Sequence, residues 1–312
     1  METNDIARGI SEHWTDGVDH PAVEVLVGIP AFNEEVGIGS VVLMANQYAD
    51  GVIVVDDGST DRTAETAELA GATVIRHETN RGKGAAIRTI LDSAATIGCE
   101  ALVLIDGDGQ HVPAEIAAVA APALDGDADL VVGNRHHGPG SHIETPRYRR
   151  VGQYGLDRLT RFVTGVDVTD TQSGFRALSP QAIESIAPET DAMGIESEML
   201  HAATREDLRV TEVPIDVRYD GIDGQTFNPI YHGVVVGIRI LSLPRARYLV
   251  AASAVLSLVT VRLIHHRGGK RRGRALGNHP PTAPILFLLG LVCGSVLALA
   301  RNVLQSSSEQ RP

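Results

Sequence analysis

The residues whose type and spacing best suit chemistry are two carboxylates, Asp106 and Asp108, in the sequence Asp-Gly-Asp-Gly-Gln-His at residues 106–111. An apolar run comes directly before them, so the pair follows a buried strand, and the glycines let the loop curl. Hard cations such as Mg²⁺ take one or two carboxylates together with phosphate oxygens of a substrate. The spacing therefore favours a metal site over a solvated Asp-Gly turn. His111 is expected to be a turn residue, since Mg²⁺ prefers oxygen ligands.

Two earlier loops also carry acids. Residues 30–35 read Pro-Ala-Phe-Asn-Glu-Glu, and here Asn33 could simply cap the next helix, with the two glutamates favouring its positive end. Residues 54–61 read Val-Val-Asp-Asp-Gly-Ser-Thr-Asp. A carboxylate at such a strand end can accept hydrogen bonds from a base or a ribose. Asp61, the last of this run, is expected to cap a helix.

Cations form a fourth group. Arg135 follows an apolar strand, and Arg147, Arg149 and Arg150 come next in the chain. Guanidinium groups suit bidentate binding of phosphate, although Arg147 and Arg150 could instead pair with surface acids. Residues 80–84, Asn-Arg-Gly-Lys-Gly, lack the GxxxxGK[ST] frame of a phosphate loop and predict a tight start to a helix.

Strands and helices that alternate must position these loops. Apolar runs predict strands at residues 23–29, 52–55, 72–76, 101–105 and 130–132, and helical spacing predicts helices from Ile38, over 63–70 and over 84–95. This alternation is typical of an α/β domain with a largely parallel sheet. In such sheets ligands bind just outside the carboxyl ends of the strands, which is where the four loops fall.

Composition narrows the class of protein. The 312 residues are 43% hydrophobic and 21% charged, which excludes a disordered or fibrous chain. Two distant cysteines exclude a disulfide scaffold and a zinc ribbon. Residues 1–238 hold 16 of the 27 Lys and Arg and 38 of the 39 Asp and Glu, so this part makes nucleic acid an unsuitable partner. Nearly all cations are Arg and acids are scattered throughout, a pattern that indicates adaptation to high salt, as in a halophilic archaeon.

The C-terminal part differs in sign and polarity. Residues 239–312 hold 11 cations and one acid, Glu309. Residues 280–300 carry no charge and are long enough for a transmembrane helix, whereas 248–264 could span or lie in the interface. The basic cluster at 267–274 leaves the topology open. Residues 1–21 form an extension without a signal peptide, which predicts a catalytic domain at 22–238 on the cytoplasmic face of the cell membrane.

Taken together, the loops resemble those of family 2 glycosyltransferases of the GT-A type, and among them the dolichyl- or polyprenyl-phosphate sugar synthases. The resemblance covers residues 23–231. Its most specific pieces are residues 106–111, because Gln after the paired acids is typical of the lipid-phosphate branch, and Thr-Gln-Ser-Gly-Phe-Arg at 171–176. It implies a Rossmann-like GT-A fold with a mostly parallel mixed sheet and flanking helices, followed by C-terminal membrane helices.

The resemblance also implies roles for individual residues. A divalent metal, Mg²⁺ or Mn²⁺, and the diphosphate would be held by Asp106, Asp108 and Gln110. Arg135 and Arg149 would receive the acceptor phosphate, and Ser173 would lie near it. The nucleotide pocket would be formed by Pro30, Phe32, Glu34, Val55 and Asp57. Relatives usually have a Ser-Lys pair where this chain has Gln225 and Thr226, so its acceptor loop departs from the family pattern.

The implied reaction is inverting transfer of a hexose from a nucleoside-diphosphate sugar to dolichyl or polyprenyl phosphate, for protein N-glycosylation or a surface glycan. A phosphate acceptor is already anionic at neutral pH, so it needs no strong general base. Two alternatives stay open. A membrane glycosyltransferase with a sugar hydroxyl as acceptor could use Glu196 or Glu198 as a base, although both are expected to be structural, and a non-catalytic membrane scaffold would not need the paired acids.

Overall fold

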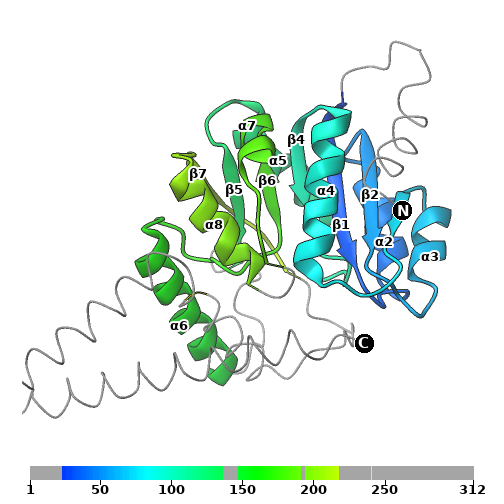
Figure 1. Cartoon of the computed structure of the whole chain (residues 1–312), viewed down its shortest axis with the longest axis horizontal. Helices are drawn as coiled ribbons and strands as arrows, with labels where there is room; N and C mark the ends of the chain where they lie inside the picture. Colours follow the sequence, from blue (N-terminus) through cyan, green and yellow to red (C-terminus); the bar gives the residue numbers. More distant parts are fainter. Residues whose placement is uncertain (1–22, 136–146, 191–193, 218–239, 241–312) are drawn as a thin grey trace, which may run out of the picture. The chain divides into compact units, whose positions relative to one another are not determined.

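Strands that are far apart in the sequence lie next to each other in one central sheet (Figure 1). A computed structural model describes residues 23–135, 147–190, 194–217 and 240, with the backbone alone for 147–154 and 156. The described sheet has the order β3-β2-β1-β4-β6-β5-β7. The strands are β1 (Val23–Ala31), β2 (Gly51–Asp56), β3 (Thr73–Arg76), β4 (Cys99–Leu104), β5 (Leu130–Asn134), β6 (Arg176–Leu178) and β7 (Val210–Pro214).

Helices cover both faces of the sheet (Figure 1). One core layer joins the sheet to α4 (Lys83–Ile97), α7 (Pro180–Ser185) and α8 (Ile195–Arg205). The other joins it to α2 (Ile38–Ala45), α3 (Thr63–Leu69) and α5 (Ile116–Leu124), which a short 3-10 turn (Pro113–Glu115) precedes. The helix α6 (Arg147–Thr164) packs against α8. The strand β1 is buried along most of its length, because its apolar side chains contribute to the cores on both faces of the sheet.

The predicted α/β class is confirmed, but the sequence reading missed two strands. The strand β6 is antiparallel to both β4 and β5, and β7 is parallel to β5. The strand β6 has three residues and contains the buried Arg176, and β7 is half-buried and includes Thr211 and Glu212, so neither shows the apolar run that predicted the other strands. The sheet is therefore mixed.

The capping interpretation of Asn33 is wrong. The helix α2 starts after Gly37, four residues later. Asn33 adopts the left-handed conformation with φ 57°, and its side-chain oxygen accepts a hydrogen bond from Thr60 N at 2.9 Å. Asp61 does accept a hydrogen bond from Thr63 N, the first residue of α3, at 3.0 Å. Asn33 thus binds the neighbouring loop rather than the helix that follows it, whereas Asp61 binds the start of its own helix.

The chain divides into two compact units, Met1–Gly237 and Ile238–Pro312, and the site lies in the first. The predicted N-terminal extension, Gln225, Thr226 and the two apolar segments at 248–264 and 280–300 lie outside the described residues. Within the described part of the chain, no helix has the length and apolar character needed to cross a membrane.

Candidate active site

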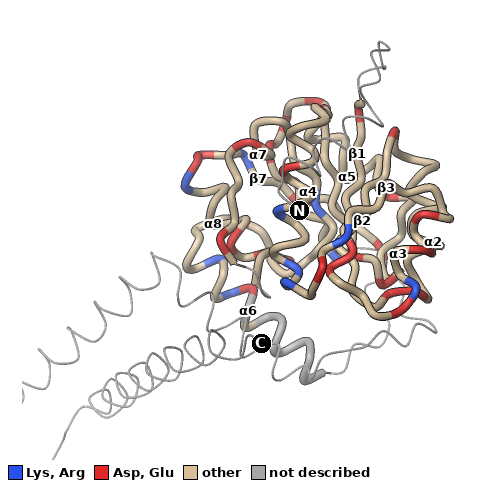
Figure 2. The backbone as a smooth tube through the Cα atoms, turned by 45° about the vertical axis from the view of Figure 1, so that its right-hand side comes forward, with Lys and Arg blue, Asp and Glu red and all other residues tan. Residues whose placement is uncertain are grey.

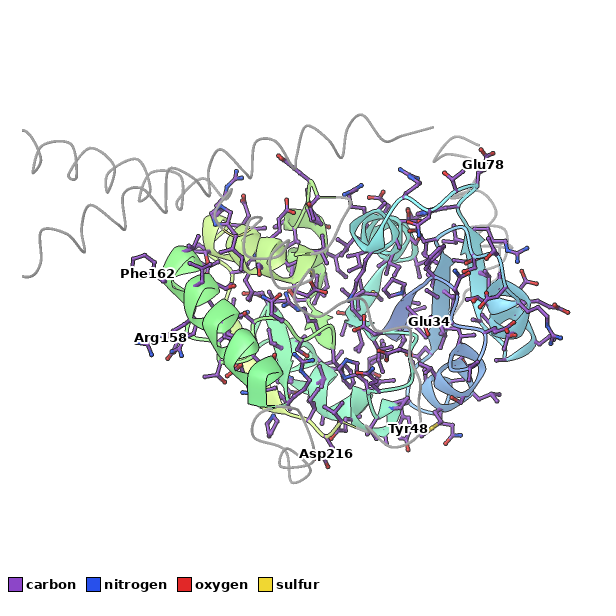
Figure 3. The ribbon with its side chains drawn as sticks, turned by 90° about the horizontal axis from the view of Figure 1, so that it is seen from below. Glu34, Tyr48, Glu78, Arg158, Phe162 and Asp216 are labelled. Carbon is purple, nitrogen blue, oxygen red and sulfur yellow. The ribbon has the colours of Figure 1, made fainter. Side chains whose placement is uncertain are left out.

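Five loops lie at the same end of the sheet, where the parallel strands finish, because of the directions in which the strands run. The strands β1, β2, β4 and β5 run the same way, so Phe32, Asp57, Asp106 and Arg135 follow their carboxyl ends. The strand β6 runs the opposite way between β4 and β5, and it therefore brings the segment before Arg176 to the same edge. Figure 3 looks at this edge and shows Glu34 among the strand ends.

Asp106 is the centre of the site. Its Oδ1 lies 2.7 Å from Lys83 Nζ, and Lys83 Nζ also lies 2.8 Å from Glu196 Oε1. Its Oδ2 lies 3.8 Å from His111 Nε2. The backbone of Gly174 packs against the same carboxylate, since a Cβ there would lie only 2.8 Å from Asp106 Cγ. Asp106 thus contacts Lys83 from α4, His111 from its own loop and Gly174 from the loop before β6, while Glu196 from α8 holds Lys83.

The acids at this end of the sheet have pKa values shifted in opposite directions. Burial alone would raise the pKa of Asp106, but Lys83 and His111 hold it well below its usual range. Burial and then the charge of Asp106 raise the pKa of Asp108, whose Oδ1 accepts a hydrogen bond from Gln110 N at 2.9 Å. Burial, followed by Asp108, Asp106 and Asp61, raises the pKa of Glu34 to about 7. Around Asp108 and Glu34, the negative charge of the acids therefore exceeds the positive charge that the described cations supply.

The loop between β1 and α2 is held by the loop after β2. Glu34 N donates to Thr63 Oγ1 at 2.7 Å, and Glu35 N donates to Asp61 Oδ2 at 3.2 Å. In return, Glu35 Oε2 accepts a hydrogen bond from Arg62 N at 3.1 Å. These crossing bonds fix the direction of Glu34, while Phe32 remains 37% exposed beside it. Pro30 pairs with Val55 in the sheet and is half-buried.

Asp57 holds a neighbouring loop. Its Oδ1 accepts hydrogen bonds from Arg81 N at 3.0 Å and from His77 Nδ1 at 2.7 Å, and its Oδ2 accepts one from Gly82 N. The side chain is almost fully buried, so it anchors the start of α4 from below. Val55 lies in the core, and only its backbone could contact a nucleotide. A direct role of either residue in nucleotide binding stays a prediction.

Arg135 is oriented by Asp170. Its Nε lies 2.7 Å from Asp170 Oδ2 and its second terminal nitrogen lies 2.8 Å from Asp170 Oδ1, a bidentate pair. Asp170 N in turn donates to Glu212 Oε1 on β7 at 2.9 Å. The guanidinium at the end of β5 is therefore fixed by β7 and the loop before β6. Arg149 lies in the first turns of α6, and its side chain falls outside the described residues, as do those of Arg147 and Arg150.

The segment at residues 171–176 is held together by hydrogen bonds from the side chain of Arg176, which is fully buried. Its guanidinium donates to the carbonyl oxygens of Ser173 at 2.9 Å, Thr171 at 2.9 Å and Glu196 at 2.8 Å. Burial lowers the pKa of Arg176 to about 10, while nearby acids oppose this. Ser173 is fully buried in this segment, and the next residue, Gly174, packs against the carboxylate of Asp106.

Sequence reasoning missed Lys83 as a site residue. Residues 80–84 do begin a helix tightly, with Gly82 at φ 96° before α4, but Lys83 reaches into the cluster. A signal was present: Lys83 is the one lysine among residues 1–238, where every other cation is Arg. Glu196 pairs with Lys83, whereas Glu198 accepts hydrogen bonds from Glu189 N and Thr190 N and is structural. His111, expected in a turn, is buried against Phe175 with ring centroids 5.3 Å apart.

Asp57→Asn should destabilise the protein, because an amide cannot accept from all three donors that the carboxylate now satisfies. Each buried donor left without a partner costs about 1–3 kcal/mol. We expect the free energy of unfolding in denaturant to fall by at least about 2 kcal/mol. Asp92→Asn, an exposed change on the same α4 helix, is the matched control and should be neutral. Equal stability of the two variants would show that Asp57 does not hold this loop.

Gly174→Ala should displace Asp106, because the added methyl would lie 2.9 Å from Oδ1 as well as 2.8 Å from Cγ. We expect a loss of stability of about 1–3 kcal/mol and a loss of activity larger than stability explains. Gly155→Ala in α6 is the control, since nothing lies within 4 Å of its position. That change should be neutral or stabilising, as alanine favours helices. Thermal unfolding and turnover of both variants test the prediction.

The raised pKa of Glu34 predicts a pH effect on stability. A group that titrates at about 7 when folded, against an ordinary value of 4.5, favours the folded state below pH 4.5. That contribution is lost as pH rises toward 7. The difference in unfolding temperature between wild type and Glu34→Gln should therefore change across this window in metal-free protein. A difference that stays constant with pH would contradict the raised pKa.

Comparison with known proteins agrees with this architecture. The chain is 34% identical over 241 residues to UDP-N-acetylglucosamine--dolichyl-phosphate N-acetylglucosaminyltransferase of Methanococcus voltae, covering 71% of this chain and 96% of the relative. It is 31% identical over 225 residues to the dolichyl-phosphate hexose transferase of Haloferax volcanii, covering 70% of this chain and 93% of the relative.

Among solved structures, glucosyl-3-phosphoglycerate synthase from Mycobacterium tuberculosis, in complex with Mn²⁺, UDP-glucose and phosphoglyceric acid, shares the fold. The TM-score is 0.57 at 23% identity, over 77% of this chain and 82% of that chain. Residues 26–186 match the sequence profile described as glycosyl transferase family 2. The fold, the strand-end loops and this match lead to one conclusion: the chain is a glycosyltransferase that belongs to family 2.

Proposed function

We propose that the protein transfers a hexose from a nucleoside-diphosphate sugar to dolichyl or polyprenyl phosphate, with inversion at the anomeric carbon. The observation that carries the proposal is the division of charge along one sheet edge. Asp106 and Asp108 follow β4, whereas Arg135 follows β5, with only the start of β6 between them. The names of the archaeal relatives, both dolichyl-phosphate sugar transferases, support a lipid phosphate as acceptor.

The residues present fit a divalent metal. In the described part of the chain, no group of three or more His, Cys, Asp or Glu side chains could hold an ion by itself. Two carboxylates completed by substrate phosphate oxygens are nevertheless a common set for Mg²⁺. Burial and then the negative charge of Asp106 raise the pKa of Asp108, and a bound cation would relieve both effects. Asp106, Asp108 and Gln110 would hold the ion, which when bound would neutralise charge on the leaving nucleoside diphosphate.

The chemistry asks little proton transfer of the protein. An oxygen of the acceptor phosphate would form a bond to the anomeric carbon as the bond to the diphosphate oxygen breaks, and the electron pair would leave on the diphosphate. Since the acceptor is already anionic, catalysis rests on placement and electrostatics. Arg135, held by Asp170, would orient the attacking phosphate. Glu196 is paired with Lys83, an arrangement that does not favour a general base for a hydroxyl acceptor.

The apolar, basic segment at 239–312 supports a place at the cell membrane, with the catalytic domain on the cytoplasmic face. Acidic residues occur throughout the backbone of the described unit (Figure 2), which supports a source that lives in high salt. In that setting the lipid-linked phosphosugar would feed protein N-glycosylation or assembly of a surface glycan.

The test is transfer of radiolabelled sugar from a panel of nucleotide sugars to dolichyl phosphate in high-salt membranes. Label should reach the lipid from one donor, with Mg²⁺ and not with EDTA. Asp108→Asn should lower the rate by about a hundredfold or more, and Asp92→Asn should not change it. Folded protein that labels no lipid with any donor would remove the lipid-phosphate proposal. Label in a sugar hydroxyl acceptor would support the alternative enzyme instead.

A further inference from the structure

Lys83 occupies a position that the proposed metal ion would also need. Its ammonium lies 2.7 Å from Asp106 Oδ1 and 2.8 Å from Glu196 Oε1, so it bridges two partly buried acids. The other carboxylate oxygen of Asp106 faces His111, and Gly174 closes the side behind it. A divalent ion could therefore reach Asp106 only by displacing Lys83 or by sharing the carboxylate with it.

We propose that Lys83 excludes the divalent ion from Asp106 until the nucleoside diphosphate is bound, and so sets the order in which donor and metal bind. This inference rests on the proposed function. Without nucleotide, an ion at Asp108 would lose the hydration it has in water and would compete with an ammonium for Asp106. Charge-assisted hydrogen bonds such as that of Lys83 are roughly twice as strong as neutral ones. Because Mg²⁺ gives up its water ligands reluctantly, it would not displace an ammonium held by two carboxylates unless a substrate supplied further oxygen ligands.

Nucleotide changes this balance. A diphosphate offers the ion several oxygen ligands at once, which the two carboxylates of the free site do not. Its negative charge also gives Lys83 a new partner, while Glu196 keeps the ammonium at the site. The ion then gains more than it loses by approaching Asp106. Exclusion in the free enzyme would keep the crowded carboxylates neutralised without a bound metal.

The experiment measures Mn²⁺ binding by electron paramagnetic resonance with no nucleotide, with UDP and with GDP. Wild type should bind Mn²⁺ weakly alone and at least about tenfold more tightly with one nucleotide. Lys83→Met should bind Mn²⁺ alone at least about tenfold more tightly than wild type. Arg81→Gln removes an exposed charge two residues away, whose backbone contacts Asp57 rather than Asp106, and should change this affinity by less than about twofold.

A double variant, K83Q/E196Q, separates direct competition from net charge. It removes one positive and one negative group, so the net charge of the site is unchanged and only Asp106 is released. Competition predicts tighter Mn²⁺ binding without nucleotide, whereas net charge alone predicts none. Because Glu196→Gln leaves Lys83 on Asp106, that single change should not tighten binding. The double variant also leaves one buried charge fewer than Lys83→Met, which protects its folding.

The outcomes are distinct. Wild type that binds Mn²⁺ equally well with and without nucleotide overturns the inference whatever the variants do. The same holds if K83Q/E196Q matches wild type in metal-only affinity. Wild type that binds no Mn²⁺ under any condition instead removes the metal-dependent donor site of the proposed function.

Discussion

The carboxylate of Asp106 follows the largely buried strand β4 and is itself only 27% exposed, so its charge must be compensated by the groups around it. The surrounding structure supplies that compensation from separate parts of the chain. Lys83 comes from the start of α4, His111 from the same loop, and the Gly174 backbone from the segment before β6. The groups that compensate the charge of Asp106 thus come both from α4, which follows β3, and from the segment before β6.

The position of Lys83 depends on a series of hydrogen bonds that begins at Asp57. Asp57 accepts hydrogen bonds from the backbone of Arg81 and Gly82, which fixes the residue directly before α4. His77 closes this arrangement, with one ring nitrogen on Asp57 and the other 3.0 Å from Thr89 Oγ1 inside α4. The loop after β2 therefore acts on the cluster around Asp106 through the start of a helix. A residue can matter for a donor site in this way without touching the donor.

The sequence could predict the first five strands and the loops after them, because long apolar runs and Gly-rich strand ends are local signals. It could not predict β6, since the buried guanidinium of Arg176 interrupts any apolar pattern and is satisfied only by carbonyl groups that the fold brings together. Lys83 and Glu196 are 113 residues apart, so no spacing rule could pair them. Asp57 was expected at the nucleotide, and its oxygens accept hydrogen bonds from two backbone N–H groups and from the His77 ring.

The antiparallel strand β6 explains why the site can hold charges of both signs at one edge. A parallel strand between β4 and β5 would bring a carboxyl end there, followed by another outward loop. Running the other way, β6 brings its start, and Arg176 turns the preceding residues back against Asp106 on one side and toward Asp170 on the other. Asp170 then fixes Arg135. The buried Arg176 thus supports both the acidic and the cationic groups of the site. Its own charge is tolerated because its guanidinium donates hydrogen bonds to three carbonyl oxygens.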